Sequence, residues 1–166
     1  MALRKSTQSN LRCMATNADD ASALLPVWGQ HTVVAAQFAL NDVLEMIPWP
    51  AGTIIHSLKA KVEDLDSNGT PLVTLDFGIL TGQWLAALDD AGAARVCGTD
   101  FATASTVGQA GGSIDVAAAL ILGLAPSSLD RSIGFKVAAA AATLTAGAKI
   151  TVSASFIPAP QGVTIT

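Results

Sequence analysis

The sequence predicts an all-β protein: an antiparallel two-sheet β-sandwich, with a jelly roll as the first choice and an immunoglobulin-like sandwich as the second. Apolar and polar residues alternate over several strand-length segments, and turn signals such as Asn68-Gly69 separate them. Seven or eight such segments recur at a spacing of roughly 10 to 20 residues, as in two-sheet sandwiches. One stretch of the chain lacks the alternation and predicts one long loop.

Three parts are expected along the chain: an extended N-terminal arm over residues 1–29, a sandwich domain over 30–160 and a C-terminal tail over 161–166. The first part collects Ser, Asn, Asp and Thr and shows no sustained periodicity, which is typical of an arm.

Charge and apolar residues are unevenly placed in this arm. Arg4, Lys5 and Arg12 give the first twelve residues three positive charges, whereas the remainder carries a net charge of −7. Basic charge without interleaved aromatic residues favours a disordered, solvated arm, or one that docks on an acidic protein, over an arm that binds nucleic acid. Near the end of the arm, large apolar side chains are expected to pin it to the body or to a neighbouring subunit: Leu24, Leu25 and Trp28.

Four strands are expected in the first half of the sandwich. Residues 31–39 and 43–49 form apolar segments of strand length, and Pro48 and Pro50 end the second because neither can donate to a sheet ladder. Period-2 alternation then continues over residues 53–63 and 72–79, with Ile54, Leu58, Ala60 and Val62 on one face of the earlier segment. The turn 66–71 between them predicts a β-hairpin.

The second half begins with the long loop, which is rich in Gly, Ala and Thr. Short helices are expected at 84–88 and 100–105, and the loop as a whole is expected to carry contacts. Residues 113–124 have strand length, although their alanines leave a helix open. Strands at 131–143 and 149–157, joined by a turn containing Gly147, predict a second hairpin.

The sequence predicts no catalytic, cofactor or metal site. Residues 64–69 match the start of a calcium-binding EF-hand loop, but Leu75 stands where a bidentate Glu is required, so we interpret Asp64, Asp66 and Asn68 as turn residues. His56 is placed on the apolar face of its strand, as a packed histidine rather than a catalyst. His31 is the only other histidine, and no nucleophile elbow, zinc-binding helix or phosphate loop is present. Two distant cysteines, Cys13 and Cys97, match no disulfide or zinc pattern.

Composition favours contact with other protein. Hydrophobic residues make up 51% of the chain and charged residues 13%, about half the usual charged share, so much of the surface must be Ala, Gly, Ser and Thr. No signal peptide is expected, and the longest apolar run, 116–125, is about half of a membrane span. With no tyrosine, a stacking platform for nucleic acid is not expected either.

The sequence resembles a family of structural proteins of tailed-bacteriophage heads, the capsid decoration or cement proteins. The resemblance lies in an Asn-Asp-Val segment at 41–43, Pro-Ala-Gly at 50–52, the Asp-Leu-Asp and Asn-Gly-Thr-Pro segments within 64–71, and Val-Gly-Gln-Ala-Gly at 107–111. These segments span about two-thirds of the chain and leave the first thirty residues uncovered. They are turn and strand signatures that carry no active site.

The resemblance implies a structural virion protein, not an enzyme, that decorates the outer surface of a phage capsid and bridges neighbouring major capsid protein subunits. It further implies a homodimer or homotrimer, made in the host cytoplasm, with no direct contact to nucleic acid or membrane. The alternative is a receptor- or glycan-binding sandwich module of a head fibre or tail tip, for which Trp84 and Phe101 in the long loop are the candidate exposed aromatic residues.

Overall fold

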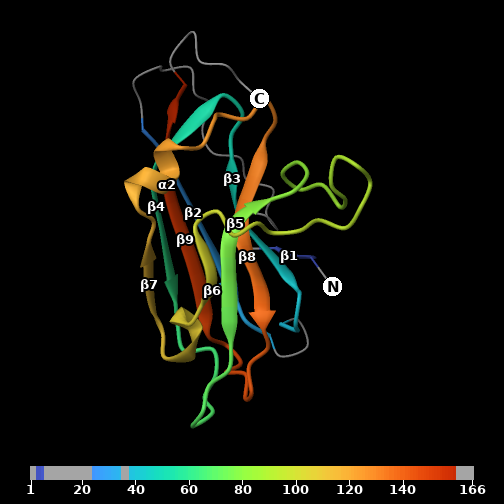
Figure 1. The fold of residues 1–166 in the computed structure, drawn as a ribbon, viewed down its shortest axis with the longest axis vertical. Helices are drawn as coiled ribbons and strands as arrows, with labels where there is room; N and C mark the ends of the chain where they lie inside the picture. Colours follow the sequence, from blue (N-terminus) through green and yellow to red (C-terminus); the bar gives the residue numbers. More distant parts are fainter. Residues whose placement is uncertain (1–2, 6–23, 35–37, 160–166) are drawn as a thin grey trace.

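The computed structural model describes residues 3–5, 24–34 and 38–159, and these form two packed antiparallel sheets (Figure 1). One sheet, here sheet B, has the strand order β2-β9-β4-β7; the other, sheet A, has the order β1-β3-β8-β5-β6. The elements are β1 (Leu3–Lys5), β2 (Leu25–Thr32), β3 (Val43–Trp49), β4 (Thr53–Val62), β5 (Thr74–Leu80), β6 (Ala102–Ser105), η2 (Val107–Gln109), β7 (Gly112–Asp115), α2 (Ala118–Leu122), β8 (Arg131–Ala139) and β9 (Lys149–Pro158).

The strand order confirms the jelly roll. β1 adds to sheet A parallel to β3. When the remaining strands, β2 to β9, are counted from first to eighth, sheet B has the order first-eighth-third-sixth and sheet A the order second-seventh-fourth-fifth. This is the jelly-roll arrangement of two interlocked Greek keys.

Both predicted hairpins are wrong. The segments at 53–62 and 74–80 are the strands β4 and β5, but β4 belongs to sheet B and β5 to sheet A, so the connection between them crosses from one sheet to the other. The strands of the second predicted hairpin, β8 and β9, likewise belong to different sheets. Each strand pairs instead with a partner distant in sequence: β4 with β9, and β5 with β8. A turn signal shows where a strand ends, but it does not show which strand pairs with the next one.

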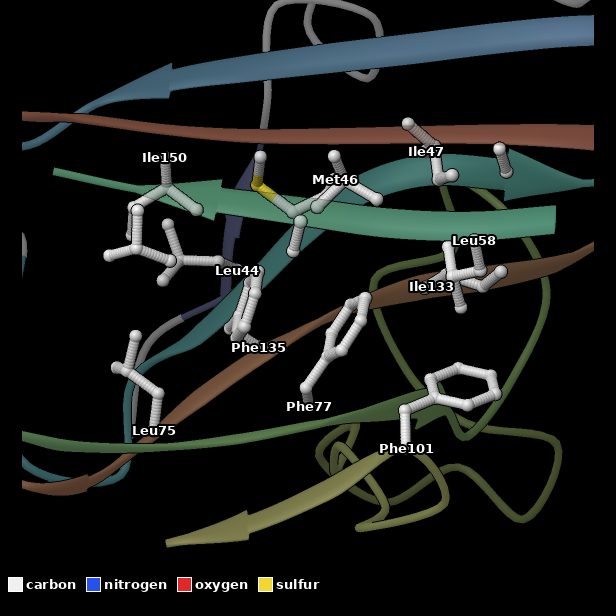
Figure 2. Packing of buried hydrophobic residues seen from close by; sticks show 14 of the residues in the cluster. Leu44, Met46, Ile47, Leu58, Leu75, Phe77, Phe101, Ile133, Phe135 and Ile150 are labelled. Atoms are coloured by element: carbon white, nitrogen blue, oxygen red, sulfur yellow. The ribbon is translucent and has the colours of Figure 1, made fainter. Parts of the chain in front are cut away.

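The core fills the space between the sheets. Figure 2 shows side chains from both sheets converging there, among them Leu58 and Ile150 from sheet B and Phe135 from sheet A. Phe77 stacks on Phe135 with ring centroids 4.4 Å apart and meets Phe101 at 5.2 Å in a tilted arrangement. Aromatic pairs of this geometry are favourable beyond their buried area.

Several predicted elements are displaced. The strand expected at 31–39 is β2, which begins at Leu25 and therefore takes residues 25–29 out of the expected arm; Pro26 and Gly29 hide its alternation in the sequence. No helix forms at 84–88, and the helix expected at 100–105 is the edge strand β6. Residues 113–124 divide into the end of β7 and the short helix α2.

A β-bulge between Ile55 and Ser57 changes the buried face of β4. The inward side chains are Ile55, Leu58, Ala60 and Val62, so Ile54 does not share their face as predicted. His56, predicted on the apolar face, is exposed, because a bulge inserts one residue and reverses the alternation beyond it.

The pole of the sandwich that holds the 63–73 and 140–148 connections is organised by Asp66. Its buried carboxylate accepts hydrogen bonds from five backbone N–H groups, those of Asn68, Leu72, Val73, Ala142 and Thr143. Burial by itself raises the pKa of Asp66, but these donors outweigh it and hold the pKa well below its ordinary value. Asp64 and Asn68 likewise accept from nearby backbone N–H groups, so the turn interpretation of this segment is confirmed and only its hairpin setting is wrong.

Candidate assembly surfaces

The loop between β5 and β6, residues 81–101, folds back over the outer face of sheet A before projecting from the body (Figure 1). Its returning strand segment hydrogen-bonds to the end of β5: the Gly98 N–H donates to the Ile79 carbonyl at 2.8 Å, and the Thr81 N–H to the Val96 carbonyl at 2.9 Å. A Cβ at Gly78 would lie 2.3 Å from the Gly98 carbonyl oxygen, so this close approach requires glycine.

A buried ion pair fixes the loop. The guanidinium of Arg95 lies on the carboxylate of Glu45 in β3, and both side chains are fully excluded from solvent. The remaining guanidinium donors reach the Thr81 carbonyl at 2.7 Å, the Ala86 carbonyl at 3.2 Å and the Ser132 hydroxyl at 2.8 Å. Glu45 also accepts from the Ser132 hydroxyl and the Leu85 N–H. A buried pair is tolerated only when its hydrogen bonds are satisfied in this way.

Because of this pair, the projecting end of the loop is held in one shape. We call residues 87–94 the loop tip: a β-bridge joins Leu88 to Ala94, and the Asp89 carboxylate accepts from the Ala91 and Ala93 N–H groups. Leu88 is half exposed, and the adjoining Asp90 forms an ion pair with Arg131 at 2.6 Å. The tip thus presents an apolar residue beside two carboxylates.

The apolar outer face beneath the loop is sealed. Val43, Leu80 and Cys97 form a small buried cluster there, separate from the main core. Burial raises the pKa of the Cys97 thiol, which lies 3.3 Å from the Gly134 carbonyl oxygen and is a structural group.

The outer face of sheet B, in contrast, is open. Its side chains are the outward members of four strands: Trp28 from β2, Thr151, Ser153 and Ser155 from β9, Ser57, Lys59 and Lys61 from β4, and Ser113 and Asp115 from β7. Trp28 is 57% exposed. A groove of about 300 Å³ lies beside it, lined by Lys59, Lys61, Ser113, Asp115, Thr151 and Ser153.

A third surface lies near the pole opposite Asp66. Residues 117–125 carry no charge, and Leu120 and Leu122 stand 46% and 77% exposed while Ile121 anchors α2 against β4. Leu24, 52% exposed, precedes β2 at the same end of the sandwich. We call residues 117–125 with Leu24 the apolar pole. Exposed apolar surface of this kind marks interaction sites.

The predicted contact residues are divided among these places. Leu24 and Trp28 are exposed, whereas Leu25, Trp84 and Phe101 are buried in the body. Arg4 and Lys5 belong to β1, and Arg12 lies outside the described residues. The loop tip, the lysines of sheet B and α2 were not predicted as contacts, although the uncharged run at 116–125 was visible in the sequence.

The described residues contain no group of three or more His, Cys, Asp or Glu side chains placed to hold a metal ion. Within the same part of the chain, no helix is long and apolar enough to cross a membrane.

Comparison with solved structures shows the family. A chain in the structure titled capsid of Ralstonia phage GP4 superposes with a TM-score of 0.83 and 30% sequence identity, over 96% of this chain and 100% of that one. The protein belongs to the same family as that phage capsid chain. It is a structural protein of a phage capsid.

A chain in the structure titled cyanophage Pam1 capsid asymmetric unit shares the fold of this protein. It superposes with a TM-score of 0.58 and 21% identity, over 90% of this chain and 94% of that one. No protein-family model and no curated protein matches the chain.

Proposed function

We propose that this capsid protein decorates the outer surface of a phage shell and stabilises it by bridging neighbouring major capsid protein subunits. The observation that carries the proposal is the apolar pole: an uncharged, exposed segment on a rigid jelly roll from a capsid family. A clamp of this type gains its free energy by burying apolar surface across a seam between subunits.

The arrangement of the chain supports the same orientation. β2 begins beside the end of β9, so the chain enters β2 at the same pole as α2. We infer that the N-terminal arm and the apolar pole meet the shell together, with the Asp66 pole facing outward.

The receptor-binding alternative is less well supported, because its two candidate aromatic residues are buried. Trp84 is 8% exposed and Phe101 6%, so neither offers a stacking surface to a glycan.

The test is binding to purified capsids that lack the protein. Saturable binding at a fixed ratio to the capsid subunit is expected, and Leu122→Glu should weaken it strongly. The matched control is Leu72→Glu, a similarly exposed leucine (57%) beside Asp66, which should bind normally. Equal loss in both variants, or no capsid binding by the unaltered protein, would contradict the proposal.

Deleting the arm needs a boundary set by the structure. Removal of residues 1–29 would delete the buried Leu25 and Val27 of β2, so the informative truncation removes residues 1–23. It also removes the edge strand β1 from sheet A, so it is expected to weaken capsid binding, and circular dichroism verifies that β2 to β9 stay folded.

A further inference from the structure

We infer that the outer face of sheet B is a docking site for a second copy of this chain, and that the occupant is the loop tip of that copy. The contact is head-to-tail: one copy offers its open sheet face and the other its projecting loop. The inference does not rest on which pole meets the shell.

Charge points to an acidic occupant. Residues 24–159 hold six basic side chains, and three of them are buried with or paired to carboxylates away from this face: Arg95 with Glu45, Arg131 with Asp90 and Lys136 with Asp76. The other three lie on sheet B: Lys59, Lys61 and Lys149. Lys59 reaches Asp115 at 2.9 Å, whereas Lys61 and Lys149 have no carboxylate within ion-pair distance among the described residues. The sheet B face therefore carries more basic than acidic side chains, with Asp115 and Glu63 as the carboxylates beside its three lysines.

The apolar features also match. Trp28 is the one exposed tryptophan of the body, since Trp49 and Trp84 are buried, and Trp is the residue type most often found at the energetic centre of an interface. In register it lies opposite Ser153, with Lys59 one strand further on, so Trp28 and the lysine-lined groove are roughly 10 Å apart across the sheet.

The loop tip offers an apolar side chain and carboxylates, which complement the tryptophan and the lysines of the sheet B face. Leu88 supplies an apolar knob, and Asp89 and Asp90 stand directly after it. The buried Arg95–Glu45 pair holds the tip in place before it binds, so little conformational entropy is lost on docking. Leu88 against Trp28 pairs apolar with apolar surface, and the tip carboxylates, of which Asp90 also holds Arg131, meet Lys61, which has no ion-pair partner among the described residues.

A head-to-tail contact has a distinctive consequence. Each copy carries both halves of the interface, so copies link in a ring if the rotation closes and in an open row if it does not. On a shell, such contacts would join decorating copies to one another independently of their contacts with the shell.

Two single variants of the full chain test the inference. Trp28→Ala damages only the face and Leu88→Ser only the tip, so each alone is expected to lose self-association by on the order of tenfold or more. Mixed together, the two variants retain one intact face and one intact tip, and they are expected to form a one-to-one dimer that grows no further. Sedimentation velocity over a concentration series measures both results, and circular dichroism verifies that each variant is folded.

Three outcomes would overturn the inference. Self-association by Leu88→Ser alone would indicate a symmetric contact between sheet B faces. Failure of the mixed variants to dimerise would show that face and tip are not partners. Monomers of the unaltered protein at high concentration and low salt would exclude the contact altogether. Lys61→Gln, which lowers the net charge by one, should weaken association, and Thr99→Glu, an exposed site where the net charge falls by the same amount, should not.

Discussion

Glu45 and Asp66 are both buried carboxylates that fix loops, yet their negative charges are stabilised in different ways. Asp66 accepts hydrogen bonds from five backbone N–H groups of two connections at one pole. Glu45 is held instead by a cationic side chain, that of Arg95, fifty residues later in the chain. Backbone donors are present in every sequence, so the first arrangement tolerates changes of side chain around it. The second fails when one residue is replaced.

The largest expected effect follows from breaking the side-chain pair. Arg95→Met leaves the Glu45 charge buried without its counterion, and the free energy of unfolding should fall by about 3–5 kcal/mol. The double variant Glu45→Leu with Arg95→Met removes both charges and should recover most of this loss. Urea unfolding of both variants measures the difference; a double variant no more stable than the single one would show that packing, not charge, holds the loop.

Asp66→Asn tests the backbone-solvated carboxylate and should lower stability less than Arg95→Met, but more than the exposed control Asp64→Asn. An amide loses the negative charge and turns a donor toward backbone donors. Because the folded pKa of Asp66 lies below its ordinary value of 3.8, its contribution is present at neutral pH and is lost as pH falls below that value. The stability gap between the original protein and Asp66→Asn should therefore narrow from pH 5 toward pH 2, and a gap that stayed constant would refute this account.

Local unfolding of the loop that Glu45 holds should be distinguishable from changes at the Asp66 pole. Cys97 is a buried residue of the loop that Glu45 holds, so in a Cys13→Ser background its labelling by a thiol reagent should be very slow in the native protein. Glu45→Gln should raise the rate of Cys97 labelling more than it raises the rate of global unfolding. Asp66→Asn should leave the ratio of these two rates unchanged. Mass spectrometry at native conditions gives both rates.

The smallest effect is expected for the exposed ion pair on the same loop. Arg131 and Asp90 are 25% and 47% exposed, and Arg131→Met should cost less than about 1 kcal/mol. The contrast with Arg95→Met isolates burial as the cause of the larger loss, because each change replaces the arginine of an ion pair that joins the loop to sheet A. Comparable losses in the two variants would mean that burial is not decisive.

The same contrast explains what could be predicted from the sequence. The strands at 43–49, 53–62, 74–80 and 149–158, the jelly roll and the hydrogen-bonding role of the Asp66 turn follow from local alternation and turn residues. The Arg95–Glu45 pair could not be predicted, because its two members are distant in sequence and neither has a local signature.

Pairing failed for a related reason. In a jelly roll most consecutive strands belong to different sheets, so proximity in sequence misleads, and both hairpins were wrong. The bulge at Ile55 and Ser57 also has no composition signal, which is why His56 was placed on the wrong face. Of the contact surfaces, the exposure of Trp28 depends on which face of β2 points outward, and the burial of Trp84 depends on where the loop folds; neither follows from residue type.

The pairing of Leu25 with Phe156 and of Thr53 with Pro158 brings the start of β2 and the end of β9 to the pole that we assign to the shell. A peptide inserted directly before β2 would therefore emerge on that side, where it would compete with attachment. The turn at Gly147 lies at the other pole, has open space around it and stands beyond the hydrogen bonds of Asp66. For displaying foreign epitopes on a particle, an insertion at that turn should be the better tolerated choice.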